Sequence, residues 1–295
     1  MAMRGDWVFV GLCLMAGSAH ADTAGTLDKV RQTGEIAVGF RETSMPFSYL
    51  DGQGAPVGFG VDLCQRIVDD VRLAVGRDVT VRFQPTTSTN RIPLVQNGTV
   101  DVECASTTNN RERQQQVAFS INYFYAGTRL LVRTGSKVRS FADLRGRPVV
   151  STTGTSNYRL MRRLDKEQAL GIDLLSAKDP AESALMVATG RADAYAMDDV
   201  ILYFLRASSL RPADWEVVGE TVQVEPYAAM LRKDDPAFKK LVDGTLARLM
   251  RTGEFQALYR KWFEQPIPPK GLNLNYPMGA ELKANLTGLS DQPAD

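Results

Sequence analysis

The sequence predicts a mixed α/β protein built as two lobes with a ligand cleft between them. Short apolar segments of strand length repeatedly precede segments with apolar residues at helical spacing, which is typical of βαβ units in a largely parallel sheet. A second such series begins near Ser136, and the chain returns at its end through a strand near 228–232. Two crossings between the series predict a cleft at the carboxyl ends of the strands, beside helix N-termini, where ligands bind.

The first series is recognised by apolar periodicity. Cys64, Ile67, Val68 and Val71 recur at helical spacing, and Gly34 is typical of the residue that ends a helix. The expected elements are a helix over 27–33, a strand over 35–40, a helix over 61–75, a strand over 79–83, a helix over 90–96 and a strand over 100–104.

The second series has the same alternation. A short helical turn is expected over 141–146, and Asp235 followed by Pro236 predicts the start of a late helix. The other expected elements are strands over 148–151, 172–176, 194–198 and 215–218, helices over 154–168, 181–190 and 199–207, and a returning strand over 228–232.

Residues 1–21 are predicted to be a secretory signal peptide. Arg4 precedes an apolar core from Trp7 to Ala16 that is too short to span a bilayer, and Ala19-His20-Ala21 is a small-x-small cleavage site. Cleavage after Ala21 predicts a periplasmic protein, because no later stretch approaches the roughly 18 consecutive apolar residues of a membrane span.

The mature chain is expected to divide into four parts. Residues 22–132 form the first part of lobe 1, 133–224 form lobe 2, 225–265 return to lobe 1, and 266–295 form a Pro-rich C-terminal tail. The two crossings are expected at about 127–133 and 225–231.

Composition excludes several classes of function. The net charge of +1 does not favour binding to nucleic acid or to an anionic membrane. The chain has 1 histidine, His20, and it lies in the signal peptide. Catalysis by Ser-His-Asp or Cys-His groups and zinc sites built on histidine are therefore excluded, and we expect neither a metal nor a cofactor.

Two of the 3 cysteines, Cys64 and Cys104, remain after cleavage. The oxidising periplasm permits a disulfide between them. Because Cys64 lies on the apolar face of a predicted helix and Cys104 ends a predicted strand, we favour two buried free thiols over a disulfide.

The stretch over 104–114 has the chemistry of a carboxylate site. Ser106 and Thr108 follow a strand and can donate hydroxyl and turn N–H groups, and Arg113 can donate two parallel bonds to one carboxylate. On local composition alone, a turn with a helix cap is the stronger interpretation.

Several motifs, in this order along the chain, resemble the family 3 bacterial extracellular solute-binding proteins, and within them the glutamate/aspartate-binding components of amino-acid ABC importers. The resemblance covers essentially all of the mature chain, and each motif is weak by itself. The motifs that carry it are Val38–Glu42, Gly58-Phe59 with Asp62-Leu63, Asn90–Leu94, Ser106–Arg113, Gly127–Leu131, Asp143–Gly146, Gly154–Ser156, Met197–Asp199, Leu231–Pro236, Lys261–Phe263 and Pro266–Lys270.

The resemblance implies a type II periplasmic binding-protein fold and a role for each matching residue. Arg113, with Ser106 and Thr108, would hold the α-carboxylate of an amino acid. Thr155 and Ser156, at a helix N-terminus of the second lobe, would reach the same carboxylate, since free N–H groups and the helix dipole favour an anion. Asp198 matches the acid that pairs with the ligand ammonium. As an alternative, Asp198 could be the cap of the helix that follows, and Asp199 competes with it for both roles.

Arg41 and Arg91, with Ser88 nearby, match the residues that meet a side-chain carboxylate. The positive charges of Arg41, Arg91 and Arg113 outnumber the negative charge of Asp198. This excess of positive charge favours a ligand with two carboxylates over a cationic ligand. As an alternative, Arg41 and Arg91 could be surface or structural arginines, paired for example with Glu42 or Glu103.

The resemblance therefore implies a monomeric, non-catalytic protein that captures L-glutamate or L-aspartate and delivers it to a membrane permease. One departure bears on the ligand. Pro180 stands where glutamate/aspartate binders carry a histidine, and proline offers neither an N–H nor a polar side chain. Three alternatives stay open: a periplasmic enzyme like cyclohexadienyl dehydratase on the same fold, a binder of another polar amino acid such as glutamine, and a sensor module.

Overall fold

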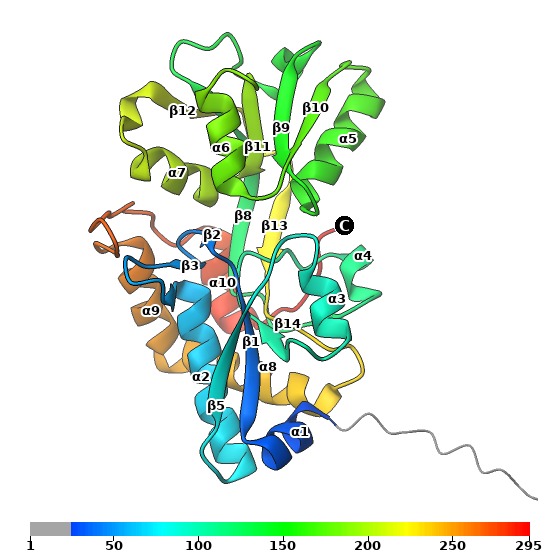
Figure 1. Ribbon diagram of the computed structural model, residues 1–295, viewed down its shortest axis with the longest axis vertical. Helices are drawn as coiled ribbons and strands as arrows, with labels where there is room; N and C mark the ends of the chain where they lie inside the picture. The colour runs from blue at the N-terminus through cyan, green and yellow to red at the C-terminus, as the bar shows by residue number, and fades with distance from the viewer. Residues whose placement is uncertain (1–24) are drawn as a thin grey trace, which may run out of the picture.

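The computed structural model describes residues 25–295 and shows two α/β lobes stacked along the long axis of the molecule (Figure 1). The predicted signal peptide lies outside the described residues. We call the lobe that carries β1 the lower lobe and the lobe that carries β9 the upper lobe, as they stand in Figure 1. Within residues 25–295, no helix combines the length and the apolar character that crossing a membrane requires.

The lower lobe is built on a five-stranded sheet of order β5-β1-β6-β14-β7. β1 pairs in parallel with β5 and β6, whereas β14 runs antiparallel to β6 and β7. The strands are β1 (Glu35–Phe40), β5 (Thr80–Pro85), β6 (Val102–Glu103), β7 (Ala118–Phe119) and β14 (Met230–Leu231). The helices are α1 (Thr26–Thr33), α2 (Phe59–Val75), α3 (Arg91–Gln96), α4 (Arg111–Gln114), α8 (Pro236–Thr252), α9 (Glu254–Phe263) and α10 (Ala280–Gly288).

The upper lobe is built on the sheet order β10-β9-β11-β8-β12, and β13 pairs with β8. Its strands are β8 (Phe124–Arg133), β9 (Pro148–Thr152), β10 (Asp173–Ala177), β11 (Ala194–Asp198), β12 (Trp215–Val218) and β13 (Val224–Tyr227). Its helices are α5 (Ser156–Gln168), α6 (Pro180–Ala188) and α7 (Asp199–Ser208), with 3-10 turns η1 (Phe141–Leu144) and η2 (Pro212–Asp214). β9, β10 and β11 are parallel, so their carboxyl ends face the lower lobe together.

Two antiparallel strands, β8 and β13, join the lobes. Their register pairs Phe124 with Tyr227 and Gly127 with Val224. The structure therefore has two crossings, at 124–127 and 224–227, which only partly overlap the expected ranges 127–133 and 225–231. The returning strand is shorter than expected, because residues 228 and 229 turn away from β13 before the two-residue β14. Ala228 instead donates its N–H to the Thr107 carbonyl, 3.2 Å away, and so connects the return to the end of β6.

Cys64 and Cys104 form a disulfide, so the expectation of two free thiols is wrong. Their Cα atoms are 5.8 Å apart, within the range that a disulfide needs. The cause is the close packing of α2 on the end of β6. Gly60 permits this approach, because a Cβ atom at that position would lie 2.1 Å from the Cys104 carbonyl oxygen. The sequence pattern identifies both cysteines as buried but does not contain the distance between them.

Besides the short β7 and η2, three larger features have no counterpart among the expected elements. A small antiparallel sheet, β2 (Thr43–Ser44), β3 (Ser48–Leu50) and β4 (Pro56–Val57), follows β1. α9 buries Phe255, Tyr259 and Phe263. The C-terminal segment forms α10 and packs on the lower lobe instead of trailing as a tail.

Candidate functional site

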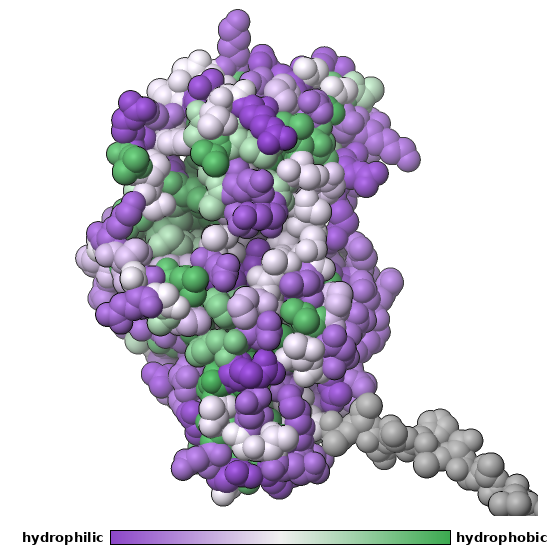
Figure 2. Space-filling view, viewed as in Figure 1, coloured by the Kyte–Doolittle hydropathy of each residue, from purple (hydrophilic) through white to green (hydrophobic). Residues whose placement is uncertain are grey.

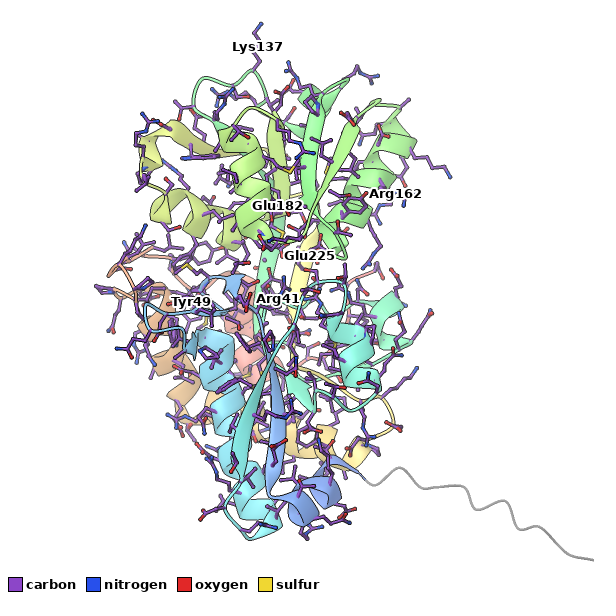
Figure 3. The ribbon with its side chains drawn as sticks, viewed as in Figure 1. Arg41, Tyr49, Lys137, Arg162, Glu182 and Glu225 are labelled. Atoms are coloured by element: carbon purple, nitrogen blue, oxygen red, sulfur yellow. A yellow bond between two sulfur atoms is a disulfide. The ribbon has the colours of Figure 1, made fainter. Side chains whose placement is uncertain are left out.

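A small cavity lies where the two lobes meet, with an empty volume of about 280 Å³. All of the predicted ligand-binding residues except Arg113 line it. Figure 3 places Arg41 and Glu225 at this level and Lys137 at the far tip of the upper lobe. The lining consists of Arg41, Ser44, Ser88, Arg91, Ser106, Thr108, Thr152, Thr155, Ser156, Asn157, Pro180, Met197 and Asp198.

Arg113 lies directly behind the lining, as the third residue of the four-residue helix α4. The Asn110 side chain caps this helix by accepting the Arg113 N–H at 2.9 Å. The guanidinium donates to the Thr108 carbonyl at 2.8 Å and, across the lobe boundary, to the Gly154 carbonyl at 3.2 Å. Burial, together with the nearby Arg91 charge, lowers the pKa of Arg113 to about 9. The capped turn and the carboxylate site are therefore compatible interpretations of the same residues.

The N-terminus of α5 faces this group from the upper lobe. Thr155 caps the helix by accepting the Tyr158 N–H at 3.1 Å. The Ser156 hydroxyl lies 3.1 Å from the Thr108 hydroxyl of the lower lobe and donates to Glu225 at 2.7 Å. The first turn of a thirteen-residue helix, with its positive dipole end, thus lies at the side of the cavity where the sequence predicts a carboxylate.

Arg91 and Arg41 are buried, which excludes the interpretation that they are surface arginines. Arg91 is 2% exposed and Arg41 4% exposed. Burial lowers the pKa of both, and the Arg91 charge contributes to the lowering of Arg41 to about 10. Two neighbouring guanidinium groups that are both buried are stabilised by a negative charge beside them. The arrangement therefore favours an anion in this part of the protein.

The partners of Arg91 leave part of its guanidinium unused. Its Nη1 donates to the Thr107 hydroxyl at 2.6 Å, and that hydroxyl donates to Glu103 at 2.6 Å. Glu103 is therefore linked to Arg91 through Thr107 and not by direct pairing. Among residues 25–295, the Arg91 Nε atom and the hydroxyls of Ser44 and Ser88 are buried with no hydrogen-bond partner. All three residues line the cavity together with Arg41.

Asp198 ends β11 and is almost fully buried. Its carboxylate accepts from Asn157 Nδ2 at 2.8 Å and from the Tyr227 hydroxyl. Burial raises the pKa of Asp198, and the negative charge of Glu225 adds to the rise. Its side chain makes no cap bond to α7; the neighbouring Asp199 accepts N–H groups of Gly127 and Val200 instead. The capping alternative for Asp198 is thus excluded by its contacts.

The charge balance predicted from the sequence needs correction. Glu103 and Glu225 are fully buried beside the cavity residues, so Arg41, Arg91 and Arg113 do not face Asp198 alone. Sequence reasoning considered Glu103 only as a structural partner and placed 225 in a crossing. A strongly buried acid in a strand that links two lobes is recognisable only when the packing around it is known.

Pro180 begins α6 and lines the cavity, with Asp179 capping the helix through the Glu182 N–H at 2.8 Å. The departure from the glutamate/aspartate pattern therefore lies in the site itself. The first turn of α6 offers no polar side chain at that point, in contrast to the first turn of α5.

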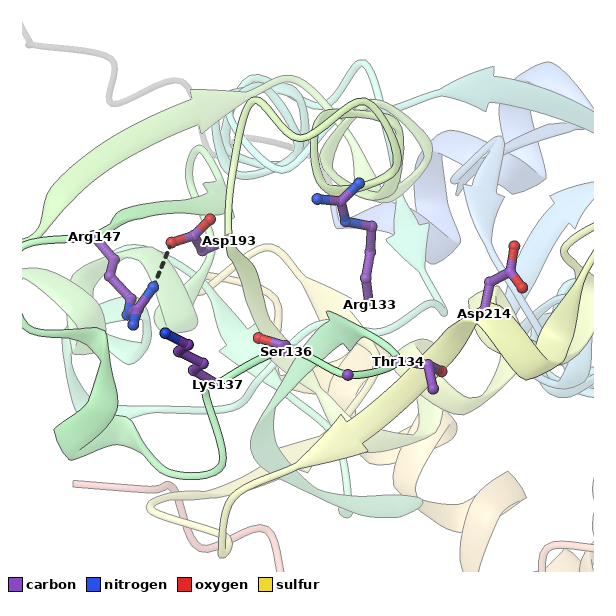
Figure 4. Close-up of a pocket in the computed structure, with 8 residues that line it drawn as sticks. Arg133, Thr134, Ser136, Lys137, Arg147, Asp193 and Asp214 are labelled. Carbon is purple, nitrogen blue, oxygen red and sulfur yellow. Dashed lines mark hydrogen bonds and ion pairs between the residues drawn. The ribbon is translucent and has the colours of Figure 1, made fainter.

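A larger pocket on the upper lobe lies away from the predicted site and is lined by Arg133, Thr134, Gly135, Ser136, Lys137, Arg147, Asp193 and Asp214 (Figure 4). Its charges are mixed, and Arg147 pairs with Asp193 at 3.0 Å. None of the predicted binding residues lines this pocket. No group of three or more metal-ligating side chains occurs within the described part of the chain.

Comparison with known proteins agrees with this geometry. The profile of the bacterial extracellular solute-binding proteins, family 3, matches residues 36–265. The L-glutamate/L-aspartate-binding protein of Pseudomonas aeruginosa is 45% identical over 288 residues, which are 97% of this chain and 95% of that protein. The glutamate/aspartate import solute-binding protein of Escherichia coli is 47% identical over 281 residues, 93% of each chain. Both relatives are binding proteins and not enzymes.

A solved structure shows how far the fold alone decides the ligand. An ancestral arginine-binding protein bound to arginine has a TM-score of 0.71 and 30% sequence identity, covering 78% of this chain and 98% of that chain. That protein holds a cationic amino acid in the same architecture. The ligand must therefore be inferred from the side chains that line the cavity.

Proposed function

Because the chain belongs to the bacterial extracellular solute-binding proteins of family 3, with the expected type II periplasmic fold, we propose that it captures L-glutamate or L-aspartate for import by an ABC-type transporter. In this role it is a binding protein and not an enzyme. We keep the expected chain order, with lobe 1 in 22–132 and 225–265 and lobe 2 in 133–224, but place the passage between the lobes within β8 and β13 and the segment 266–295 on the lower lobe. The working cycle is then the opening and closing of the lobes about β8 and β13.

The burial of Arg41 and Arg91 in one cavity, with Asp198 on the opposing lobe, is the observation that carries the proposal. A ligand ammonium would pair with Asp198, while a side-chain carboxylate would occupy the arginine side, where Ser44, Ser88 and Arg91 have unused hydrogen-bonding atoms. A cationic side chain there would meet two buried positive charges. Glutamine would leave the charges of Arg41 and Arg91 to Glu103, the buried acid that acts on both.

The α-carboxylate of the ligand would bind between Arg113, Ser106 and Thr108 below and Thr155 and Ser156 above. These groups belong to different lobes, so one carboxylate can hold the cleft shut. The direct contacts between Thr108 and Ser156 and between Arg113 and Gly154 already join the lobes in the structure. A ligand that contacts both lobes would stabilise this closed arrangement relative to an open one.

We infer a periplasmic location from the predicted signal peptide, with cleavage after Ala21, and a monomer that presents its closed form to a membrane permease. Secretion tests the first inference through the N-terminal sequence of the exported protein, which should begin at Asp22. Sedimentation of the purified protein tests the second.

Calorimetry against the common amino acids tests the ligand assignment. The protein is first unfolded to release any bound ligand and then refolded. We expect binding of glutamate, aspartate or both, and no binding of arginine. Tight binding of glutamine or histidine without binding of either acid would contradict the proposal.

The Arg91→Ala variant tests the side-chain contact. Loss of a charge-assisted hydrogen bond, about 1.5–3 kcal/mol, should weaken the acidic amino acid about 10- to 100-fold and glutamine much less. The matched control is Arg72→Ala, which removes a half-exposed arginine of α2 that pairs with Asp69. Equal losses for glutamate and glutamine would show that Arg91 does not contact the ligand side chain.

A further inference from the structure

The last residues of the chain lie against the segment that carries the predicted carboxylate site. We call residues 290–295 the C-terminal strap and residues 105–110 the binding loop. Figure 1 shows the C-terminal end beside α4, which follows the binding loop. The strap begins after α10, where the Ser290 N–H donates to the Asn285 side chain at 2.7 Å.

The strap pairs with the binding loop through its backbone. The Ala294 N–H donates to the Asn109 carbonyl at 2.9 Å, and the Arg111 N–H donates to the Ala294 carbonyl at 3.2 Å. Asn110 and Ala294 thus form a parallel bridge. Asn109 also donates its side-chain Nδ2 to the Asp291 carbonyl at 2.8 Å. These contacts hold the residues that immediately precede α4.

A second asparagine ties the strap to the lobe crossing. Asn122 donates its N–H to the Ser290 carbonyl and its side chain to the Gln292 carbonyl, both at 2.9 Å. Asn109 donates to the Asn122 side chain at 3.0 Å, and both asparagines are fully buried. Buried amides with this many partners hold a single arrangement, because leaving any of them unpaired costs the desolvation of that group.

The connection from the strap to Arg113 is short. Asn110 caps α4 by accepting the Arg113 N–H, and the Arg113 guanidinium donates to the carbonyl of Thr108 in the binding loop. The strap bonds to the residue on each side of Asn110, namely Asn109 and Arg111. It therefore constrains both the start of α4 and the loop against which the guanidinium rests, although no strap residue lines the cavity.

We propose that the C-terminal strap is a positioning element of the ligand site, which sets affinity for the amino-acid α-carboxylate by holding the binding loop and Arg113 in place. The inference rests on the proposed amino-acid binding but not on the acidic specificity, because the α-carboxylate is common to all amino acids. Loss of the strap should weaken every ligand by the same factor and leave the ratio of glutamate to glutamine affinity unchanged.

The test uses three variants of the full-length protein and one that ends at Leu289. Ala294→Pro removes the donor to Asn109, and one lost hydrogen bond predicts about 5-fold weaker binding of the amino acid that the wild-type protein binds. Ala294→Gly keeps the N–H and should bind like the wild type. Asp295→Ala removes only the exposed pair with Arg111 and should also bind normally. The protein ending at Leu289 should bind about 30-fold more weakly.

Amide hydrogen exchange of residues 108–114 in ligand-free protein provides a readout that does not depend on the ligand. Exchange there should accelerate in Ala294→Pro and not in Ala294→Gly. Thermal unfolding of each variant separates a folded protein with weak binding from a destabilised one. Unchanged affinity and unchanged exchange in the folded Ala294→Pro variant would overturn the proposal, as would a loss that differs between ligands. If the proposed acidic specificity is wrong, the wild-type protein and every variant would prefer another amino acid to glutamate and aspartate. The effect of the strap on affinity would still be measurable with that amino acid.

Discussion

The two lobes contribute opposite charges to the same cavity. Within residues 25–295, the buried arginines Arg41, Arg91 and Arg113 all belong to the lower lobe, and the buried acid that this lobe places beside them is Glu103. The upper lobe and the crossing β13 supply two acids, Asp198 and Glu225, and the N-terminus of α5. In the proposed binding mode, the lower lobe therefore holds an anion, and the upper lobe receives a cation and closes over it.

The lobes differ in rigidity as well. The lower lobe carries the disulfide between α2 and β6, immediately before the binding loop, and the strap bonds to that loop from the other side. Within the described residues, the upper lobe has no such cross-link. This difference indicates that the lower lobe is the preformed part of the site. The following predictions test it, in order of expected effect.

The largest effect is expected from removal of the disulfide. The cysteines are 40 residues apart, and a loop of that length predicts a loss of about 4 kcal/mol in the free energy of unfolding when both are replaced by serine. Denaturant unfolding of the Cys64→Ser/Cys104→Ser protein measures it, with the wild type under reducing conditions as the control. Equal unfolding free energies for the oxidised wild type and the variant would show that the lower lobe does not depend on the cross-link.

Arg113→Ala should follow. Loss of the buried, charge-assisted contact to the α-carboxylate, about 3 kcal/mol, predicts about 100-fold weaker binding of glutamate and glutamine alike. The matched control is Arg111→Ala, because Arg111 lies on the same helix but is exposed. If calorimetry found weaker binding of glutamate but not of glutamine, Arg113 would contact the side chain of the ligand. That result would contradict its assignment to the α-carboxylate.

Asp198 tests the contribution of the upper lobe through pH. Burial and Glu225 raise its pKa, so its ionised fraction falls as the pH decreases through that raised value, and affinity for the ligand ammonium should fall with it. Asp198→Asn should bind about 30-fold more weakly at neutral pH, for a loss of about 2 kcal/mol, and should lose this pH dependence. Asp199→Asn, a change beside it, should keep the dependence.

The same raised pKa has a consequence for stability. The folded ligand-free protein holds the Asp198 proton more tightly than the unfolded chain, so this group's contribution to the free energy of unfolding declines as the pH rises from the usual carboxyl range to the raised pKa. Bound ligand should reverse this trend, because its ammonium favours the ionised carboxylate. Unfolding measured against pH with and without ligand checks both signs.

The smallest effect is expected at Ser44. Its buried hydroxyl has no partner among the described residues and lines the cavity near Arg41, so Ser44→Ala should weaken the acidic ligand about 3-fold, by less than 1 kcal/mol. Glutamine should be affected less. Thr43→Ala, on the same short strand but outside this cavity, is the control. A change of similar size in both variants would show that the hydroxyl itself makes no contribution.

Most strands and helices of the two series were predictable because local patterns determine them. β1, β11 and β12 have the expected bounds, and the Asp235-Pro236 start of α8 is present with its cap, since Asp235 accepts the Phe238 N–H at 3.1 Å. The small β2–β4 sheet and α10 were missed. Their strands are two or three residues long, and α10 has almost no amphipathic pattern, so only contacts with the lower lobe select them.

The predicted binding residues could be named mainly because their motifs resemble those of the family, since residue type at strand ends and helix starts by itself favours a capped turn. Their assembly in one cavity could not be derived, nor could the buried Glu225, which the pattern places in a crossing without showing what surrounds it. Asn157 was also missed. An asparagine in a helix does not indicate a binding site by itself, and only its contact with the Asp198 carboxylate shows that it belongs to the site.

The sequence by itself determined the α/β alternation, the two crossings, the lack of histidine in the mature chain and the set of arginines and hydroxyls from which a carboxylate site can be built. The first three follow from periodicity and composition, which are local, and the last follows from the resemblance of the motifs to the family. Only the tertiary structure decided that Cys64 reaches Cys104, that Glu103 and Glu225 balance the arginines, and that residues 290–295 bond to the binding loop. Each of these depends on distances between segments far apart in the chain, which packing sets and local pattern does not contain.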